Sequence, residues 1–195
     1  MTVDLPTRRS PLADYAARFA ALPDGLRVRE TPFLGQFSLR VDPGGPAAFA
    51  VQQLLSCALP GPCTETRAAQ AEVLWLGPDE FLVLTPDAVS TDLPYQLREA
   101  IGDEFGSVID VSAQRTTLEL DGPLVHDVLA RGCAIDLDPR VSPAGTCVQT
   151  LIAQTGVILR VLGPKRVCLL VRPSFATYLA DWLIDASAEY RRQSP

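Results

Sequence analysis

The chain has 195 residues, of which 47% are hydrophobic and 21% are charged, and this composition is ordinary for a globular protein. Its formal charge of −6 disfavours binding to nucleic-acid phosphates or anionic lipid, so we expect neither a nucleic-acid partner nor a membrane. The first ten residues lack the apolar segment of a secretory signal, and no apolar run approaches the roughly 20 residues that span a bilayer, which together predict a cytoplasmic protein.

Residues 1–24 are predicted to form an N-terminal arm with a short helix, which apolar spacing places between Leu12 and Leu22. Alternating or consecutive apolar residues predict strands at 26–30, 37–41, 73–75 and 81–84. Helices are predicted from Pro46 to near Cys57 and over residues 92–101. The strands at 73–75 and 81–84 are apolar on consecutive residues, which predicts burial on both faces.

The second part of the chain follows the same plan. Strands are predicted at 108–111, 116–120, 148–153, 157–162 and 167–171, a helix at 122–131, and a loop at 136–146. The clearest helix signal begins at Pro173 and has six apolar residues at helical spacing: Phe175, Tyr178, Leu179, Trp182, Leu183 and Ala186.

Two turns repeat within the sequence. Leu76-Gly77-Pro78 and Leu162-Gly163-Pro164 each precede two charged residues, an apolar strand and a proline. The order of the pieces indicates a degenerate duplication with pseudo-repeats at 25–104 and 105–195, which together form one compact unit. We therefore expect an α+β fold of two ββαββα units, with antiparallel sheets covered by helices on one side.

Few residues carry an obvious chemistry. His126 is the single histidine, and a solvated surface position explains it better than a catalytic role. Gly44-Gly45-Pro46 is predicted to be a tight turn before a helix, because proline offers no N–H group to a phosphate. Asp79-Glu80 corresponds to Lys165-Arg166 in the repeat, and opposite charges at equivalent positions indicate solvated turns.

The five cysteines show no Cys-x-x-Cys spacing, which predicts free, buried thiols; they are Cys57, Cys63, Cys133, Cys147 and Cys168. Asp110, Ser112 and Arg115 lie together between two predicted strands, where Asp110 and Ser112 are expected to bond turn amides and Arg115 to pair with Asp110. We predict a structural turn network there, and no catalytic, cofactor-binding or metal-binding residue in the chain.

Several longer sequence segments resemble those of a known family. They are residues 108–112 followed by Arg115, residues 132–137, residues 145–153, residues 172–178 leading to Trp182 and Tyr190, and residues 76–80. In order and spacing they resemble the gamma subunit of bacterial heterotetrameric sarcosine oxidase over about residues 25–190. The resemblance implies the fold of the folate-dependent aminomethyltransferase of glycine cleavage.

The resemblance also implies a role. The complex serves sarcosine catabolism and one-carbon metabolism: it demethylates sarcosine oxidatively to glycine and yields H2O2 with formaldehyde or 5,10-methylenetetrahydrofolate. The gamma chain is then a non-catalytic structural subunit that meets the other subunits, especially the large alpha subunit. FAD, FMN, NAD, folate and zinc are expected in those partner subunits and none in this chain.

Two alternatives stay open at the sequence level. One is a stand-alone folate-dependent one-carbon transferase, which needs acidic residues in a deep central pocket. The other is the equivalent subunit of a related N-methyl amino acid dehydrogenase, such as N-methylglutamate dehydrogenase.

Overall fold

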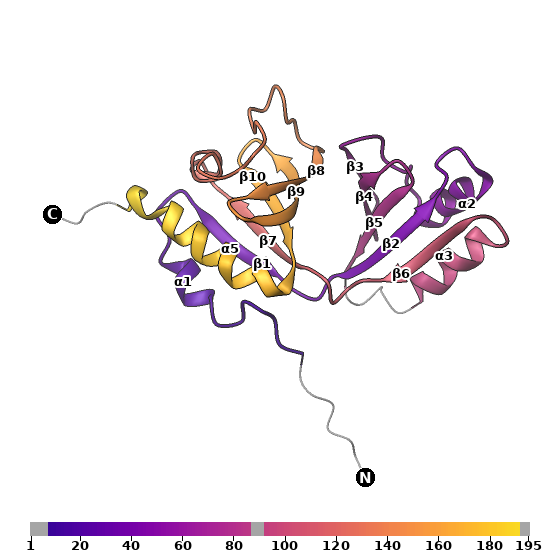
Figure 1. The fold of residues 1–195 in the computed structure, drawn as a ribbon, viewed down its shortest axis with the longest axis horizontal. Helices are drawn as coiled ribbons and strands as arrows, with labels where there is room; N and C mark the ends of the chain where they lie inside the picture. The colour runs from indigo at the N-terminus through magenta and orange to yellow at the C-terminus, as the bar shows by residue number, and fades with distance from the viewer. Residues whose placement is uncertain (1–7, 87–91, 192–195) are drawn as a thin grey trace, which may run out of the picture.

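Two five-stranded sheets form the centre of the fold in a computed structural model, which describes residues 8–86 and 92–191 (Figure 1). The first sheet has the strand order β3 (Glu65–Arg67), β4 (Glu72–Gly77), β5 (Glu80–Thr85), β2 (Gly35–Val41) and β6 (Gly106–Asp110). The second has the order β1 (Arg27–Thr31), β7 (Thr116–Asp121), β10 (Arg166–Val171), β9 (Thr155–Gly163) and β8 (Cys147–Ile152). All neighbouring strands in both sheets are antiparallel.

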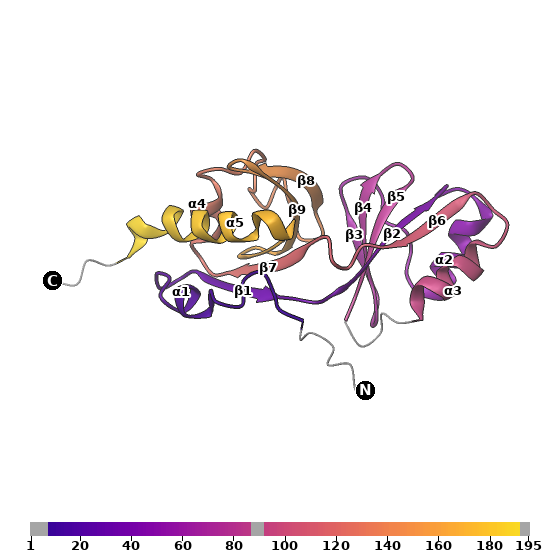
Figure 2. The same ribbon diagram turned by 60° about the horizontal axis from the view of Figure 1, so that its bottom comes forward.

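Helices cover the outer face of each sheet, as expected from the sequence. Helices α2 (Pro46–Leu55) and α3 (Leu93–Ile101) pack on the first sheet, whereas α1 (Ala16–Ala20), α4 (Val125–Leu129) and α5 (Pro173–Ala186) pack on the second. A short 3-10 helix, η2 (Ala188–Tyr190), follows α5. Figures 1 and 2 show α2 and α3 at one end of the molecule and α1 and α5 at the other, so the inner faces of the sheets are turned toward each other.

A third apolar cluster fills the space between the two inner faces. Leu74, Leu82 and Leu84 from the first sheet belong to the same cluster as Ile158 and Leu170 from the second. The edge strands also meet, because the N–H of Cys147 donates to the carbonyl of Cys63 at 2.9 Å. The sheets are therefore joined by both apolar packing and main-chain hydrogen bonds.

The consecutive apolar residues of β5 are explained by the burial of this strand on both of its faces. Phe81 and Val83 pack with the helices on one face, and Leu82 and Leu84 pack toward the second sheet on the other. All four residues are buried, which confirms the prediction of a strand covered on both faces.

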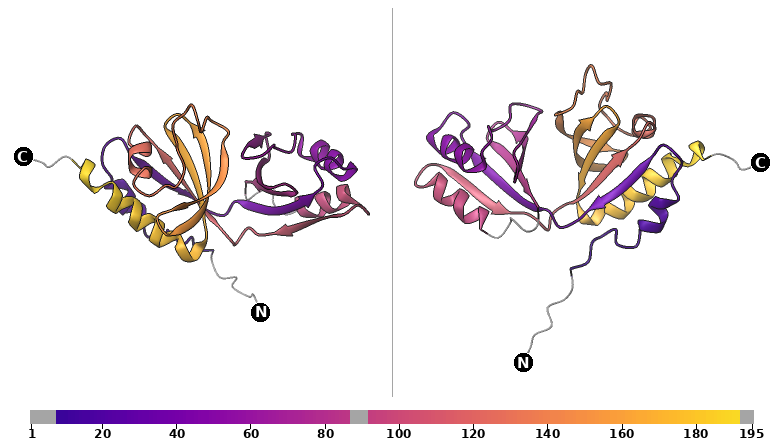
Figure 3. Two further views of the ribbon diagram at one scale, coloured as in Figure 1. Left: turned by 45° about the horizontal axis from the view of Figure 1, so that its top comes forward. Right: turned by 180° about the vertical axis from the view of Figure 1, so that it is seen from behind.

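The two halves of the chain exchange their first strands (Figures 1 and 3). The element order is β1-β2-α2-β3-β4-β5-α3 in the first half and β6-β7-α4-β8-β9-β10-α5 in the second. Strand β1 pairs with β7, and β6 pairs with β2, so each sheet contains one strand from the other half. The sheets therefore do not follow the division of the chain at residues 104 and 105.

Other details of the fold also differ from the prediction. The ββαββα order leaves out one strand in each half, because β3 and β8 precede the hairpins. Strand β8 matches the strand predicted at 148–153, whereas β3 was not predicted. The polar sequence Glu65-Thr66-Arg67 of β3 carries no apolar alternation that predicts a strand. Helix α1 covers only Ala16–Ala20, since a short isolated helix is marginal, and α4 begins at Val125 because Gly122 has a positive φ.

The repeated Leu-Gly-Pro turns do occupy equivalent places. The first joins β4 to β5 and the second joins β9 to β10, and each hairpin has a register shift beside its turn. This agreement supports the duplication inferred from the sequence.

We expect Gly122→Ala to lower the free energy of unfolding by about 3 kcal/mol. Gly122 has a φ of 130°, and an added Cβ atom would stand 2.1 Å from the carbonyl oxygen of Gly25. Urea unfolding followed by circular dichroism measures the loss. Gly163→Ala is the matched control, because its added Cβ would have no atom within 4 Å from any described residue beyond its own chain neighbours. Equal losses in the two variants would show that the contact with Gly25 is not important.

Candidate functional site

Asp110 and Ser112 form a hydrogen-bonded turn between β6 and β7. The N–H and the hydroxyl of Ser112 both donate to Asp110 Oδ1, at 2.9 and 2.6 Å. The N–H of Gln36 donates to Ser112 Oγ at 3.0 Å, and the Gln36 amide donates to the carbonyl of Arg115 at 2.7 Å. These bonds tie the turn to β2 and engage Asp110 Oδ1 and the Ser112 hydroxyl.

The predicted ion pair between Arg115 and Asp110 does not form, because the Asp110 carboxylate faces the Ser112 side of the turn. No carboxylate pairs with the half-buried Arg115 side chain anywhere in residues 8–86 and 92–191. Burial lowers the pKa of Arg115, Arg172 lowers it further, and Glu80 partly opposes them. Arg115, Asp110 and Ser112 also line a surface cavity of about 670 Å³.

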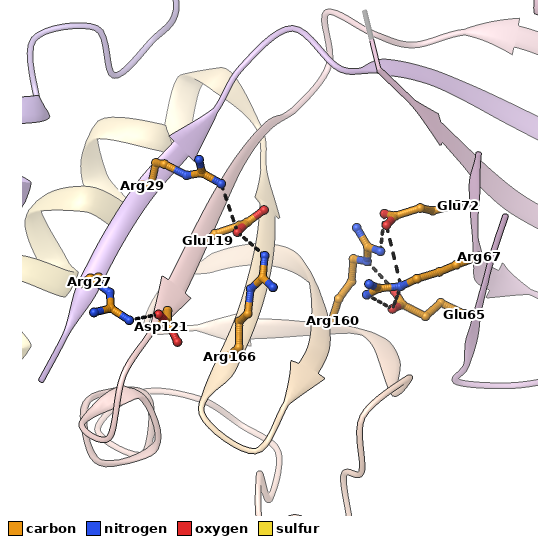
Figure 4. Close-up of polar contacts among 9 residues, drawn as sticks. All are labelled: Arg27, Arg29, Glu65, Arg67, Glu72, Glu119, Asp121, Arg160 and Arg166. Atoms are coloured by element: carbon orange, nitrogen blue, oxygen red, sulfur yellow. Dashed lines mark hydrogen bonds and ion pairs between the residues drawn. The ribbon is translucent and has the colours of Figure 1, made fainter. Parts of the chain in front are cut away.

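An ionic network that the sequence analysis missed lies between the sheets (Figure 4). Arg160 of β9 binds Glu65 of β3 through Nε and Glu72 of β4 through Nη2, the latter at 2.5 Å. The side chains of Arg160 and Glu65 are only 4% and 2% exposed. Arg67 adds a bond from its Nε to Glu65 Oε1 at 2.9 Å. A buried guanidinium thus connects one sheet to the other.

A second group of ion pairs lies on the inner face of the second sheet. Glu119 of β7 accepts from Arg166 at 2.8 Å and from Arg29 at 3.4 Å, and Arg27 pairs with Asp121 (Figure 4). Burial raises the pKa of the Glu119 carboxyl, but Arg166 and Arg29 together hold it below its ordinary value. The carboxylate therefore stays ionised and paired at neutral pH.

A cavity of about 260 Å³ separates these two groups of ion pairs. Glu72 and Arg160 line one side, and Glu119, Arg166 and Cys168 line the other. The volume falls below the 300–1,000 Å³ that is usual for small-molecule sites. The acidic side chains Glu72 and Glu119 already have arginine partners, so their carboxylates are occupied in holding the two sheets.

His126 differs from its prediction. Its ring on α4 is half-buried, and its Nε2 atom is enclosed without a hydrogen-bond partner in the described part of the chain.

Among the described side chains, no three of His, Cys, Asp and Glu are grouped as a metal site. No helix in residues 8–86 and 92–191 is long and apolar enough to cross a membrane.

All five cysteines are unpaired, but their burial is not uniform. Cys147 and Cys168 are buried, Cys57 and Cys133 are half-buried, and Cys63 is exposed, which contradicts the expected burial for Cys63. Cys63 lies in the turn that precedes β3, where few residues cover it. Burial raises the pKa of Cys168 and that of Cys147 to about 12.

We expect iodoacetamide at pH 8 to label Cys63 rapidly and to leave Cys147 and Cys168 unmodified in the folded protein. A buried thiol with a pKa near 12 offers almost no thiolate to the reagent. Peptide mass spectrometry over a time course gives the rate at each site, and labelling in urea serves as the control. Equal rates at Cys63 and Cys168 would contradict the burial of β10.

Comparisons with known proteins relate this chain to one family over most of its length. The sarcosine oxidase, gamma subunit family matches residues 40–189. The sarcosine oxidase gamma subunits of Corynebacterium sp. strain P-1 and Arthrobacter sp. are 35% and 36% identical over 187 residues, which is 94% of this chain and 91% of each relative. This chain belongs to the sarcosine oxidase gamma subunit family. The resemblance inferred from the motifs is thus confirmed.

Solved structures agree with this membership of the gamma subunit family. A chain of the heterotetrameric sarcosine oxidase from Corynebacterium sp. U-96, in complex with pyrrole 2-carboxylate, is 36% identical. It superimposes with a TM-score of 0.88 over 96% of this chain and 98% of that one. Aminomethyltransferase T of the glycine cleavage system from Bartonella henselae is 15% identical, with a TM-score of 0.58 over 86% of this chain and 48% of that one. The predicted α+β fold of the aminomethyltransferase type is confirmed.

Proposed function

We propose that this chain is the non-catalytic gamma subunit of a cytoplasmic heterotetrameric sarcosine oxidase. In this role it holds the complex together while other subunits demethylate sarcosine to glycine. The observation that carries the proposal is the structural match to a chain of the Corynebacterium oxidase over nearly the full length of both chains. We further propose that FAD, FMN, NAD, folate and zinc bind in the partner subunits and not here.

The inner-face geometry supports a structural role. The acids Glu65, Glu72 and Glu119 pair with arginines of the same chain, so none of these carboxylates is left to bind a pterin or an amine. The cavity beside them is small, at about 260 Å³. His126 lies on α4, on the outer side of the second sheet, and does not line that cavity.

We expect omission of this chain from co-expression with the other subunits to reduce the yield of soluble oxidase, because a permanent partner normally buries well over 1,000 Å². Activity is measured as sarcosine-dependent H2O2 production per flavin. His126→Ala in the complete complex should keep this activity within about twofold, whereas loss of a general base costs about 100-fold or more.

Three results would contradict the proposal. The first is full assembly without this chain, together with loss of activity per flavin that His126→Ala reproduces. The second is stoichiometric binding of tetrahydrofolate to the purified chain in calorimetry, which would favour the one-carbon transferase. The third is turnover of N-methylglutamate instead of sarcosine, which would assign the chain to the related dehydrogenase.

A further inference from the structure

Arg115 and Arg172 are neighbours at one end of the second sheet. Thr116 and Val171 are the last paired residues of β7 and β10 at that end, and the two arginines are the next residue on each side. Both side chains line a cavity of about 200 Å³, together with residues of β8 and β9. The pairing of β7 with β10 thus brings two guanidinium groups to one small cavity.

Neither guanidinium has a counter-ion in the residues that the structure describes. Other arginines on the inner face do have partners, such as Arg166 with Glu119 and Arg160 with Glu65. Glu80 acts on Arg115 only through space, because the Glu80 carboxylate accepts from Arg40 at 2.9 Å. Two like charges side by side, one of them half-buried, are unfavourable unless an anion joins them.

The surroundings fit a single carboxylate. Guanidinium groups bind carboxylates with two parallel hydrogen bonds, and a pair of them can hold one acidic side chain from two directions. Arg172 also occupies the N-cap position of α5, a helix of 14 residues whose positive end adds to the local potential. The formal charge of the whole chain is −6, so this positive site is a local exception on an acidic protein.

Exposed apolar side chains lie beside the arginine pair. Phe175 is 44% exposed, and its N–H donates to the carbonyl of Arg172 at 2.9 Å. Tyr178 packs edge-to-face on Phe175 at 6.5 Å, and Leu151 of β8, opposite the cavity residue Gly156, is 53% exposed. Aromatic and arginine side chains together are typical of the residues that dominate protein–protein binding.

We propose that Arg115 and Arg172 bind the carboxylate of an aspartate or glutamate of a partner subunit, and that Leu151, Phe175 and Tyr178 pack around that contact. The inference rests on the proposed function, since it needs the complex. The charge of the pair selects an acidic partner residue, and the apolar side chains exclude water from the contact.

The test is the affinity of this chain for the rest of the oxidase. The complex is co-expressed with wild-type chain, Arg115→Gln, Arg172→Gln or the double variant, and the dissociation of this chain is followed at increasing NaCl concentration. We expect each single variant to weaken association by about 10-fold or more, and the salt dependence to fall with the loss of each charge. Arg140→Gln is the control, because Arg140 pairs with Asp138 two residues away at 2.8 Å.

A photo-crosslinking residue in place of Leu151 gives a second readout that does not depend on the arginines. We expect it to capture a peptide of a partner subunit that contains an aspartate or glutamate.

If the complex forms and the arginine variants match Arg140→Gln, the inference is wrong although the proposed function stands. If wild-type chain does not associate with the other subunits, both are wrong. If acetate or phosphate raises the melting temperature only when both arginines are present, and association is unchanged, the pair binds a small anion and the docking proposal is overturned.

Discussion

Arg160→Met is expected to lower the free energy of unfolding by about 3–5 kcal/mol. The substitution removes a guanidinium that is 4% exposed and leaves Glu65, whose side chain is 2% exposed, without its buried partner. The same change removes the bond from Arg160 to Glu72, which keeps only its 3.7 Å ion pair with Arg67, so the ionic link between β9 and the first sheet is lost. Urea unfolding of the purified chain, followed by the fluorescence of Trp75 and Trp182, measures the effect.

Arg67→Met is the matched control for this prediction. Arg67 binds the same Glu65 carboxylate, but its side chain is 45% exposed, and a solvent-exposed ion pair contributes about 1 kcal/mol or less. The double variant Arg160→Met with Glu65→Gln should recover part of the loss, because it no longer buries a carboxylate that has lost its buried partner. Equal losses for Arg160→Met and Arg67→Met would show that burial of the network does not determine its contribution.

The sequence predicted the features that depend on local pattern. The run at 81–84 identified a strand covered on both faces, and the apolar spacing after Pro173 located α5. The repeated Leu-Gly-Pro turns predicted two equivalent hairpins, which are β4–β5 and β9–β10. Each of these signals is contained in a few consecutive residues, so no knowledge of the tertiary structure is needed to recognise it.

The exchange of β1 and β6 between the two sheets could not be predicted from such local patterns. Alternation in β1 determines which residues face the core, but it does not choose between β2 and β7 as the partner. Strand β6 has the same ambiguity, and its pairing with β2 joins residues from opposite halves of the chain. The partner is decided by packing across the whole molecule.

The candidate site also has one part that could be predicted from the sequence and one part that could not. The turn of Asp110 and Ser112 was predictable, because the two residues bond within three positions. The link from Arg160 to Glu65 spans 95 residues and reaches a strand that was not predicted. One signal was available, since Arg160 interrupts an otherwise apolar run at 157–162, and an arginine in such a run indicates a buried partner.

Fragments of the chain cut between residues 104 and 105 are expected to fold only when mixed. The first fragment lacks β6, whose Val108 belongs to the core under α2 and α3. The second lacks β1 together with Leu12, Leu26 and Val28 of its own core. Each fragment alone also exposes its side of the apolar cluster between the sheets, which includes Leu82 and Ile158.

The mixed fragments should form a one-to-one complex, since two exchanged strands and the cluster between the sheets bury well over 1,000 Å². Size-exclusion chromatography gives the stoichiometry, and circular dichroism of each fragment alone and of the mixture gives the gain in structure. The control is fragment 105–195 fused through a flexible linker to residues 8–33, which restores α1 and β1 to the second sheet. We expect this fusion to gain structure that the fragment alone lacks. Independent folding of both fragments without association would mean that each half completes its own sheet, and that the exchange of β1 and β6 is not what holds the halves together.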